Sequence, residues 1–358
     1  MKKLIVTGLA AAFALGMSSL AMAKPVSDMD LDISGLAQIN ASWSERQNID
    51  DEIDLARLRL NFSAKPADHV SVYAELEATD NRSGSDGAWG DLMARCAATG
   101  CTSSDGIADS SIADLYVDLT YIPEVSARIG QFALPISYEL NTDEYDLETI
   151  NYTLGVGDFG VRDRGIMLFG KPIPEFAWAV FGMNGAGAIT GANNDVDDQS
   201  SYGLKLDWNP LENLNFKIWG NFQEETGTSG GLVSATGSSS DVDAFGLGAN
   251  YTYQGFRLMA EYNNKDTERN NAENDVTEWF LHASYIIPET DLQVVARYDK
   301  YDTDDGVAAT ADTDVHVTTV GLNWNFEKNA RVQLMHEFVG GDGVNEMDGT
   351  DLMLSVRF

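Results

Sequence analysis

Residues 132–161 combine a cluster of carboxylates with many bulky apolar side chains. The carboxylates belong to Glu139, Asp143, Glu144, Asp146 and Glu148. The apolar side chains are Phe132, Leu134, Pro135, Ile136, Tyr138, Leu140, Tyr145, Leu147, Ile150 and Tyr152. Because apolar side chains need a surface to pack on, the stretch predicts a folded loop that holds its acids in place. Fixed carboxylates in a narrow passage select ions and solutes by size and charge.

Arginines lie at positions from which they could face these acids. Arg128 precedes the acidic stretch, Arg162 and Arg164 follow it, and Arg57 and Arg59 lie upstream. Opposed charges interact more strongly in a narrow, partly desolvated gap than in bulk water. We therefore expect these acids and arginines to form a pore constriction, with an inward-folded loop facing a basic wall. The alternative is a loop that packs on the outer surface.

The elements that would position these residues are strands with two unlike faces. Leu58 and Leu60 alternate with Arg57 and Arg59, and the same alternation recurs along the chain from about residue 31. A strand buried on both faces would not place arginine on its second face, so that face must be wet. A β-sandwich also has alternating strands and is the alternative fold.

Short Pro-, Gly- and Asn-containing connections alternate with long acidic ones along the sequence. Seven short connections and eight long ones join sixteen strands. The long connections lie near residues 44–51, 79–110, 132–161, 184–198, 223–240, 265–274, 301–312 and 341–349. This asymmetry predicts an all-β fold, a 16-stranded antiparallel transmembrane β-barrel with short periplasmic turns and long outer loops.

The two ends of the sequence are typical of an exported outer-membrane protein. Residues 1–23 join a basic start, an apolar run and the small-x-small sequence Ala21-Met22-Ala23, which predicts a signal peptide. A membrane anchor is the alternative for this run, although it is short for a bilayer span. Residues 24–358 would form one barrel domain. The last strand alternates and ends in Phe358, which resembles the assembly signal of outer-membrane barrels.

The charge and the cysteines limit the partners. The formal net charge is −33, which argues against nucleic acid because phosphate contacts need dense Lys and Arg. Most of the acidic excess lies in the long connections. Cys96 and Cys101 share one polar stretch of an exported chain, which predicts a local disulfide. A metal pair is the alternative, but no histidine lies near enough in sequence to complete a zinc site.

Nothing in the sequence indicates a cofactor or a metal, and we predict no catalytic residues. His69, His282, His316 and His336 are far apart in sequence, and no Gly-rich phosphate loop is present. Two other classes remain as alternatives to a channel. One is an outer-membrane barrel enzyme of the lipase or protease type, and the other is a soluble periplasmic β-sandwich binder.

Several short motifs resemble the phosphate-selective porin O/P family of Gram-negative outer membranes. The motifs are Arg128-Ile129-Gly130-Gln131-Phe132, then Pro135 and Glu139, and downstream Arg162-Asp163-Arg164-Gly165-Ile166 with Gly170. Arg57 and Arg59 are similar to the family's pore-lining arginines. The resemblance implies a homotrimeric porin in outer-membrane lipid whose third loop folds inward. Its partners would be small hydrophilic solutes and ions, including phosphate or other anions. The acidic third loop and the scarcity of lysine in the outer loops are more typical of a general diffusion porin.

Overall fold

The alternating segments of the sequence form sixteen strands. They are β1 (Asp30–Ser44), β2 (Glu52–Ala67), β3 (Val70–Ala78), β4 (Ser111–Ile122), β5 (Val125–Ala133), β6 (Arg162–Ile173), β7 (Phe176–Met183), β8 (Ser201–Leu211), β9 (Leu214–Thr228), β10 (Thr236–Tyr253), β11 (Phe256–Arg269), β12 (Ala272–Ile286), β13 (Leu292–Asp304), β14 (Thr313–Glu327), β15 (Ala330–Gly341) and β16 (Gly349–Arg357). The computed structural model describes residues 30–44, 52–78, 111–159, 162–184, 200–228, 236–269, 272–304, 313–341 and 348–358. The predicted signal peptide, Cys96 and Cys101 lie outside these residues, so the signal peptide and the disulfide stay predictions.

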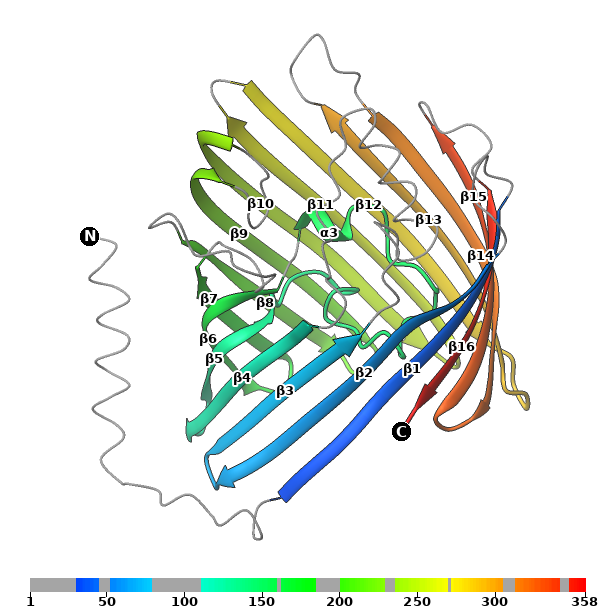
Figure 1. Ribbon diagram of the computed structural model, residues 1–358, viewed down its shortest axis with the longest axis horizontal. Coiled ribbons are helices and arrows are strands. Elements are labelled where there is room, and N and C mark those ends of the chain that lie inside the picture. The colour runs from blue at the N-terminus through cyan, green and yellow to red at the C-terminus, as the bar shows by residue number, and fades with distance from the viewer. Residues whose placement is uncertain are drawn as a thin grey trace.

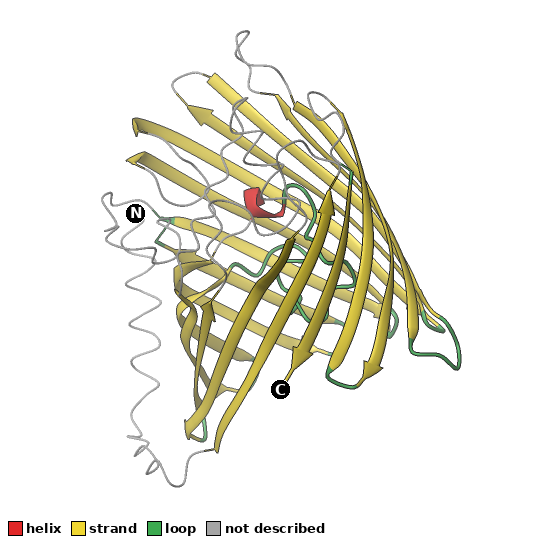
Figure 2. Ribbon diagram, turned by 45° about the vertical axis from the view of Figure 1, so that its right-hand side comes forward, coloured by secondary structure: helices red, strands yellow, loops and turns green. Residues whose placement is uncertain are grey.

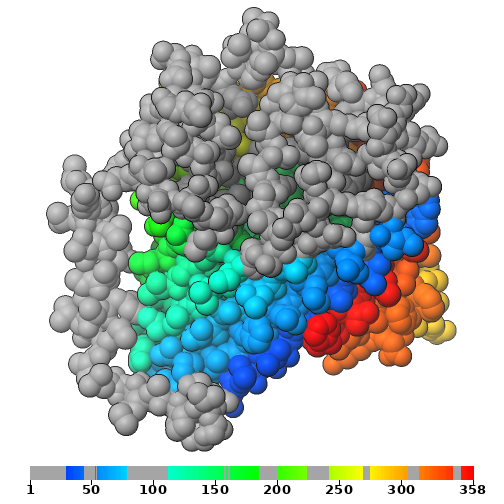
Figure 3. Space-filling model, in the orientation of Figure 1, coloured from blue at the N-terminus to red at the C-terminus, as the bar shows by residue number. Residues whose placement is uncertain are grey.

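Each strand pairs antiparallel with its neighbours in sequence, and β1 pairs with β16 to close the barrel (Figure 1). The closure reaches the last residue. Gly35 N donates to Phe358 O at 2.7 Å, and Phe358 N donates to Gly35 O at 3.0 Å. Figure 3 shows the C-terminal strand lying against β1 on the outer surface. The 16-stranded antiparallel barrel predicted from the sequence is confirmed, and a β-sandwich is excluded, because a sandwich keeps open sheet edges.

The two faces of the strands differ as the alternation predicts. On β14, Leu322 and Trp324 are exposed on the outside, whereas Asn323 between them is fully buried on the inside. The same holds on β12, where Trp279 and Leu281 point outward and Glu278 inward. An apolar outer band and a polar interior are the arrangement of a barrel in lipid. Among the described residues, no helix is long and apolar enough to cross a membrane.

Strands β9 to β12 extend further than the sequence predicts. The predicted loops at 223–240 and 265–274 are largely strand, because β9 continues to Thr228 and β12 begins at Ala272. The sequence there is mostly polar and has no alternation of apolar and polar residues. Backbone hydrogen bonds between strands do not depend on an apolar face, so pairing such as Asp243 with Asp266 continues beyond the apolar band.

The segment between β5 and β6 lies inside the ring of strands, together with the short helix α3 (Val156–Phe159) (Figures 1 and 2). We call residues 134–159 the inner loop. Its apolar side chains form a core with the barrel wall: Leu134, Ile136, Leu154 and Phe159 join Phe132 of β5 and Trp219 of β9 in one buried cluster. Burial of this apolar surface stabilises the inward position of the loop.

Candidate functional site

Two arginines of β2 face two glutamates of β3 across the barrel wall. The register pairs Arg59 with Glu77. Arg57 and Glu75 each lie two residues away on the same strand, so the four charged side chains share the inward face. Arg57 Nε lies 2.9 Å from Glu77 Oε1, and Arg59 Nε lies 3.2 Å from Glu75 Oε1. The wall arginines are therefore partly neutralised by acids of their own wall.

Glu144 of the inner loop completes this cluster from the opposite side. Arg59 donates to both of its carboxylate oxygens, one of them at 2.8 Å, and the Tyr152 hydroxyl donates to Glu144 at 3.1 Å. Burial favours the neutral acid, but the charges of Arg57 and Arg59 and the hydrogen bonds from Arg59 outweigh it and lower the pKa of Glu144 to about 2. Burial and the Glu144 charge raise the pKa of Tyr152 well above its usual value. Glu144 thus stays ionised and Tyr152 stays a donor at any ordinary pH.

Three further ion pairs, formed by Arg162 and Arg128, continue the wall along β4 to β6. Arg162 donates to Asp114 at 3.0 Å and to Glu75 at 3.1 Å. Arg128 donates two hydrogen bonds of 2.9 Å to Asp118. Its guanidinium also lies 3.6 Å from the centroid of the Tyr116 ring, which fixes its position. We call this inward face of β2–β6 the exposed wall, because the side chains of Arg128, Asp118 and Arg162 are partly open to water.

Arg297 of β13 holds the inner loop from the other side of the barrel. Its side chain is fully buried, as is that of its neighbour Asp299, at 3.0 Å. Its remaining bonds go to the loop: Glu139 Oε1 at 3.0 Å, Thr149 Oγ1 at 2.8 Å, Asn151 O at 2.9 Å and Tyr152 O at 2.9 Å. The guanidinium of Arg297 thus binds the loop both at Glu139 in its first half and at residues 149–152 in its second half. We call the inward face of β11–β15, which the loop covers, the covered wall.

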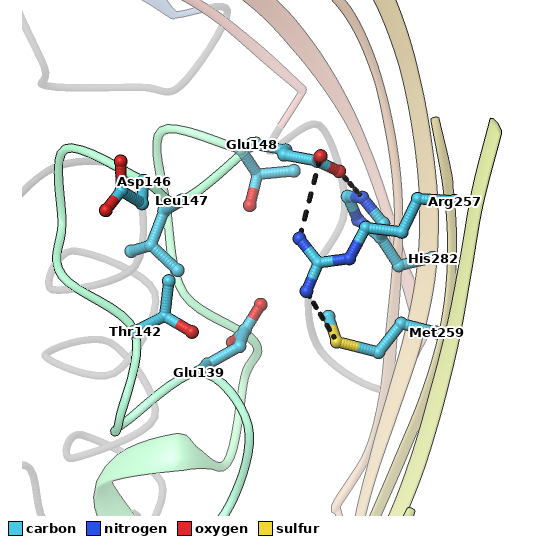
Figure 4. Close-up of a pocket in the computed structure, with 9 residues that line it drawn as sticks. Glu139, Thr142, Asp146, Leu147, Glu148, Arg257, Met259 and His282 are labelled. Atoms are coloured by element: carbon cyan, nitrogen blue, oxygen red, sulfur yellow. Dashed lines mark hydrogen bonds and ion pairs between the residues drawn. The ribbon is translucent and has the colours of Figure 1, made fainter. Parts of the chain in front are cut away.

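Glu148 forms a second attachment to the covered wall, at a small pocket (Figure 4). Its carboxylate lies 2.5 Å from His282 Nε2, 2.8 Å from Gln293 Nε2 and 3.6 Å from Arg257 Nη1. Burial opposes ionisation, but the hydrogen bond and charge of His282 and the charge of Arg257 lower the pKa of Glu148 to about 2. The backbone oxygen of Glu148 also accepts a hydrogen bond from Asn323 of β14 at 2.9 Å.

The structure brings some of the predicted constriction residues together and separates others. Arg57, Arg59 and Glu144 form one cluster, and Arg162 joins it through Glu75. Glu139 and Arg128 lie outside this cluster: Glu139 pairs with Arg297, and Arg128 pairs with Asp118. Asp143 and Asp146 are exposed: Asp143 accepts a hydrogen bond from the backbone of Tyr145, and Asp146 lies 3.5 Å from Arg357.

Arg164 is the predicted residue that least fits the cluster. In the unbroken register of β6, Arg162 and Arg164 both share the parity of Ile166, whose side chain is exposed on the outside, but only Arg162, at the end of the strand, reaches Asp114 and Glu75. Among the described residues it makes no ion pair. Sequence reasoning in turn missed the contacts of Glu77, Glu148 and Arg297. The alternation of β13 does place Arg297 on the wet face, but no pattern within one strand tells which wet residue the loop will touch.

A closed antiparallel barrel with an apolar outer band, a polar interior and a charged loop inside it is typical of outer-membrane channels. The model of the Gram-negative porin family matches residues 8–343 of the sequence. The chain belongs to this family. The narrower resemblance to phosphate-selective porins O and P is not confirmed, because the matching family is the general one.

Solved structures of outer-membrane porins have the same fold at low sequence identity. An OmpT of Vibrio cholerae that lacks loop L8 aligns over 92% of this chain and 99% of its own, with 13% identity and a TM-score of 0.66. For OmpF of Salmonella typhi, in complex with daunomycin, the values are 94%, 100%, 12% and 0.64. For an anion-selective porin from Comamonas acidovorans they are 92%, 99%, 14% and 0.62. No curated protein has a matching sequence.

Proposed function

We propose that the protein is a passive channel for small hydrophilic solutes and ions, and that its constriction lies between the inner loop and the exposed wall. One observation carries the proposal: the loop is held on both sides of the barrel, by Arg297 on the covered wall and by Arg59 on the exposed wall. A loop held at both ends keeps a fixed aperture, and a fixed aperture selects by size and charge. Family membership favours a channel over an enzyme.

We further propose that the constriction prefers anions weakly, phosphate among them. In the ion pairs that Arg57, Arg128 and Arg162 form on the exposed wall, the cation is more open to water than the acid, whereas Arg59 is buried together with its partners. The side chain of Arg162 is 29% exposed against 14% for Asp114, and that of Arg57 is 16% exposed against 3% for Glu77. On this wall a passing solute therefore meets the guanidinium groups of Arg57 and Arg162 before their carboxylate partners.

The assembly and route proposed for the protein follow from the family and the ends of the sequence. We propose that residues 1–23 direct export and are removed, that Phe358 serves as an assembly signal, and that the barrel functions as a homotrimer in outer-membrane lipid. OmpT of Vibrio cholerae, whose fold is similar, has been described in a trimer form. A monomeric mass in mild detergent would argue against the trimer.

The experiment that tests the function is reconstitution of the purified protein in planar lipid bilayers under a salt gradient. We expect discrete conductance steps and a reversal potential with the sign of weak anion preference. Absence of steps would refute the channel. Steps with a cation-selective reversal potential would leave the channel intact and refute the proposed role of the exposed wall.

A further inference from the structure

A second pair of arginines lies beside Arg57 and Arg59, across the seam where β1 and β16 close the barrel. In the register, Leu36 of β1 pairs with Arg59 on one side and with Arg357 of β16 on the other. Arg331 of β15 is a diagonal neighbour of Arg357, because its own partner in β16 lies two residues before Arg357. Leu36 and Arg331 are buried on the inside, so the alternation places these arginines on the inward face, near the turn side of the barrel.

The inner loop lies over this second pair with the ring of Tyr145. The centroid of the ring is 4.2 Å from the guanidinium carbon of Arg357 and 5.0 Å from that of Arg331. Arg331 also donates to the backbone oxygen of Glu144 at 3.2 Å, and Arg357 lies 3.5 Å from Asp146. An aromatic face attracts cations, so Tyr145 holds both guanidinium groups at one place.

The positive charge of this pair is only partly balanced. Arg331 is 5% exposed, forms no ion pair within the part of the chain that the structure describes, and has a buried Nε without a hydrogen-bond partner. Of the described acids, Asp146 alone pairs with Arg357, and 56% of its side chain is exposed. Arg57 and Arg59, by contrast, share buried glutamates of β3 and of the loop. A buried charge normally has a counter-charge, so the second pair lacks about one negative charge.

The chemistry of this place distinguishes three ways of completing it. The Tyr145 ring contacts both guanidinium groups but carries no net charge. Water would satisfy the Nε of Arg331 but would also bring no charge. An anion brings the charge, and Arg357 gives it access, because 39% of that side chain is open to water. The charge of an anion on Arg357 would still act on the buried Arg331, since salt screens buried charges much less than exposed ones.

We propose that Arg357, supported by the charge of Arg331, binds an oxyanion of the phosphate type in place of Asp146. A guanidinium presents parallel N–H donors that match two oxygens of one phosphate, which a halide does not offer. A phosphate dianion also balances two guanidinium groups once Asp146 is displaced, whereas a carboxylate balances one. Asp146 is therefore a tethered competitor for the site. Access of phosphate through the constriction rests on the proposed channel, but binding at Arg357 does not.

The test is calorimetric titration of the full-length protein in detergent with sodium phosphate, at slightly alkaline pH and constant ionic strength. We expect one saturable site per chain, above a weak background from the exposed wall, and much weaker binding of sodium acetate, which carries a single charge. R357Q should weaken phosphate binding at least about 10-fold, the range for hydrogen bonds to a charged group. D146N should tighten it about 2- to 5-fold, because the competing ion pair is exposed and weak. R331Q should weaken it by a smaller factor than R357Q, because Arg331 acts through its charge alone.

K300Q is the matched control, because it removes the same charge away from the site. Lys300 pairs with Asp302 at 3.4 Å and with Asp314 at 3.0 Å, near the outer ends of β13 and β14. It should bind phosphate like the wild type. Heat-dependent migration on gels checks that each variant is folded, and D146N keeps the test valid if R357Q fails to fold.

Equal phosphate binding by the wild type and folded R357Q would overturn the proposal. So would an unchanged or weaker affinity in D146N, acetate binding as tight as phosphate, or a wild type without a saturable site. A protein that binds phosphate in the expected way but shows no conductance steps would refute the channel and leave the site in place.

Discussion

The exposed and covered walls of the barrel use the same residue type in opposite ways. Arg162 on the exposed wall keeps 29% of its side chain open to water, whereas Arg297 on the covered wall keeps none. A buried guanidinium that is bonded on all sides fixes geometry, and its loss leaves its partners uncompensated. A partly exposed guanidinium contributes little stability but acts on whatever passes it. Burial therefore separates Arg297, which holds the loop that forms the aperture, from Arg162, which acts on the solutes that pass it.

The largest effect is expected from R297A. The substitution removes four bonds to the inner loop and leaves Glu139 and Asp299 buried without their cation. Breaking a buried ion pair costs about 3–5 kcal/mol, so we expect a large loss of unfolding free energy and a wider, noisier aperture. Denaturant unfolding and single-channel conductance measure the two effects.

R128A is the matched control on the exposed wall. Arg128 also donates two hydrogen bonds to one carboxylate, but its side chain is 23% exposed and its partner Asp118 belongs to the wall and not to the loop. We expect a loss of about 1 kcal/mol or less and an unchanged conductance noise. If R297A and R128A behave alike, the distinction between the two walls is wrong.

The next effect concerns selectivity, and it compares the loop with the exposed wall. R57A combined with R59A should shift the reversal potential toward cations, because it leaves Glu77 and Glu144 uncompensated in the aperture. E144Q combined with D146N should shift it toward anions. The reversal potential under a salt gradient measures both. Two unchanged reversal potentials would mean that solutes do not pass between Glu144 and this wall.

The sequence was sufficient for the barrel and for the wet face, but not for the partners across the lumen. Alternation has a period of two, so a strand such as β12 reports the faces of Glu278 and Trp279 directly. The position of Glu144 opposite Arg59 depends on a fold of the inner loop that no period describes. Arg164 illustrates the limit, because it has the same strand parity as Arg162, yet only Arg162 forms ion pairs among the described residues.

A smaller effect is expected from pH, and it again involves the contacts between loop and wall. The pKa of Glu144 is lowered from 4.5 to about 2. A depressed carboxyl pKa contributes stability that is fully present above the unfolded value and is lost as the pH falls through the folded value. The contributions of Glu144 to selectivity and to stability should therefore hold from pH 7 to about pH 5, with its contribution to stability declining below that and its charge lost only near pH 2. A midpoint of the reversal potential near pH 4.5 that disappears in E144Q would show that Arg59 does not hold this acid.

The smallest effect compares two tyrosines that donate to glutamates on the two sides of the aperture. The Tyr152 hydroxyl donates to Glu144 at 3.1 Å from within the loop, and the Tyr73 hydroxyl donates to Glu75 at 2.9 Å on the exposed wall. Y152F and Y73F each remove one hydrogen bond and keep the ring, so each should cost roughly 0.5–1.5 kcal/mol. Glu75 remains held by Arg59 and Arg162, whereas Glu144 loses the one loop side chain that orients it. Only Y152F should therefore shift the reversal potential measurably, and an equal shift in Y73F would assign the selectivity to the wall carboxylates instead of the loop.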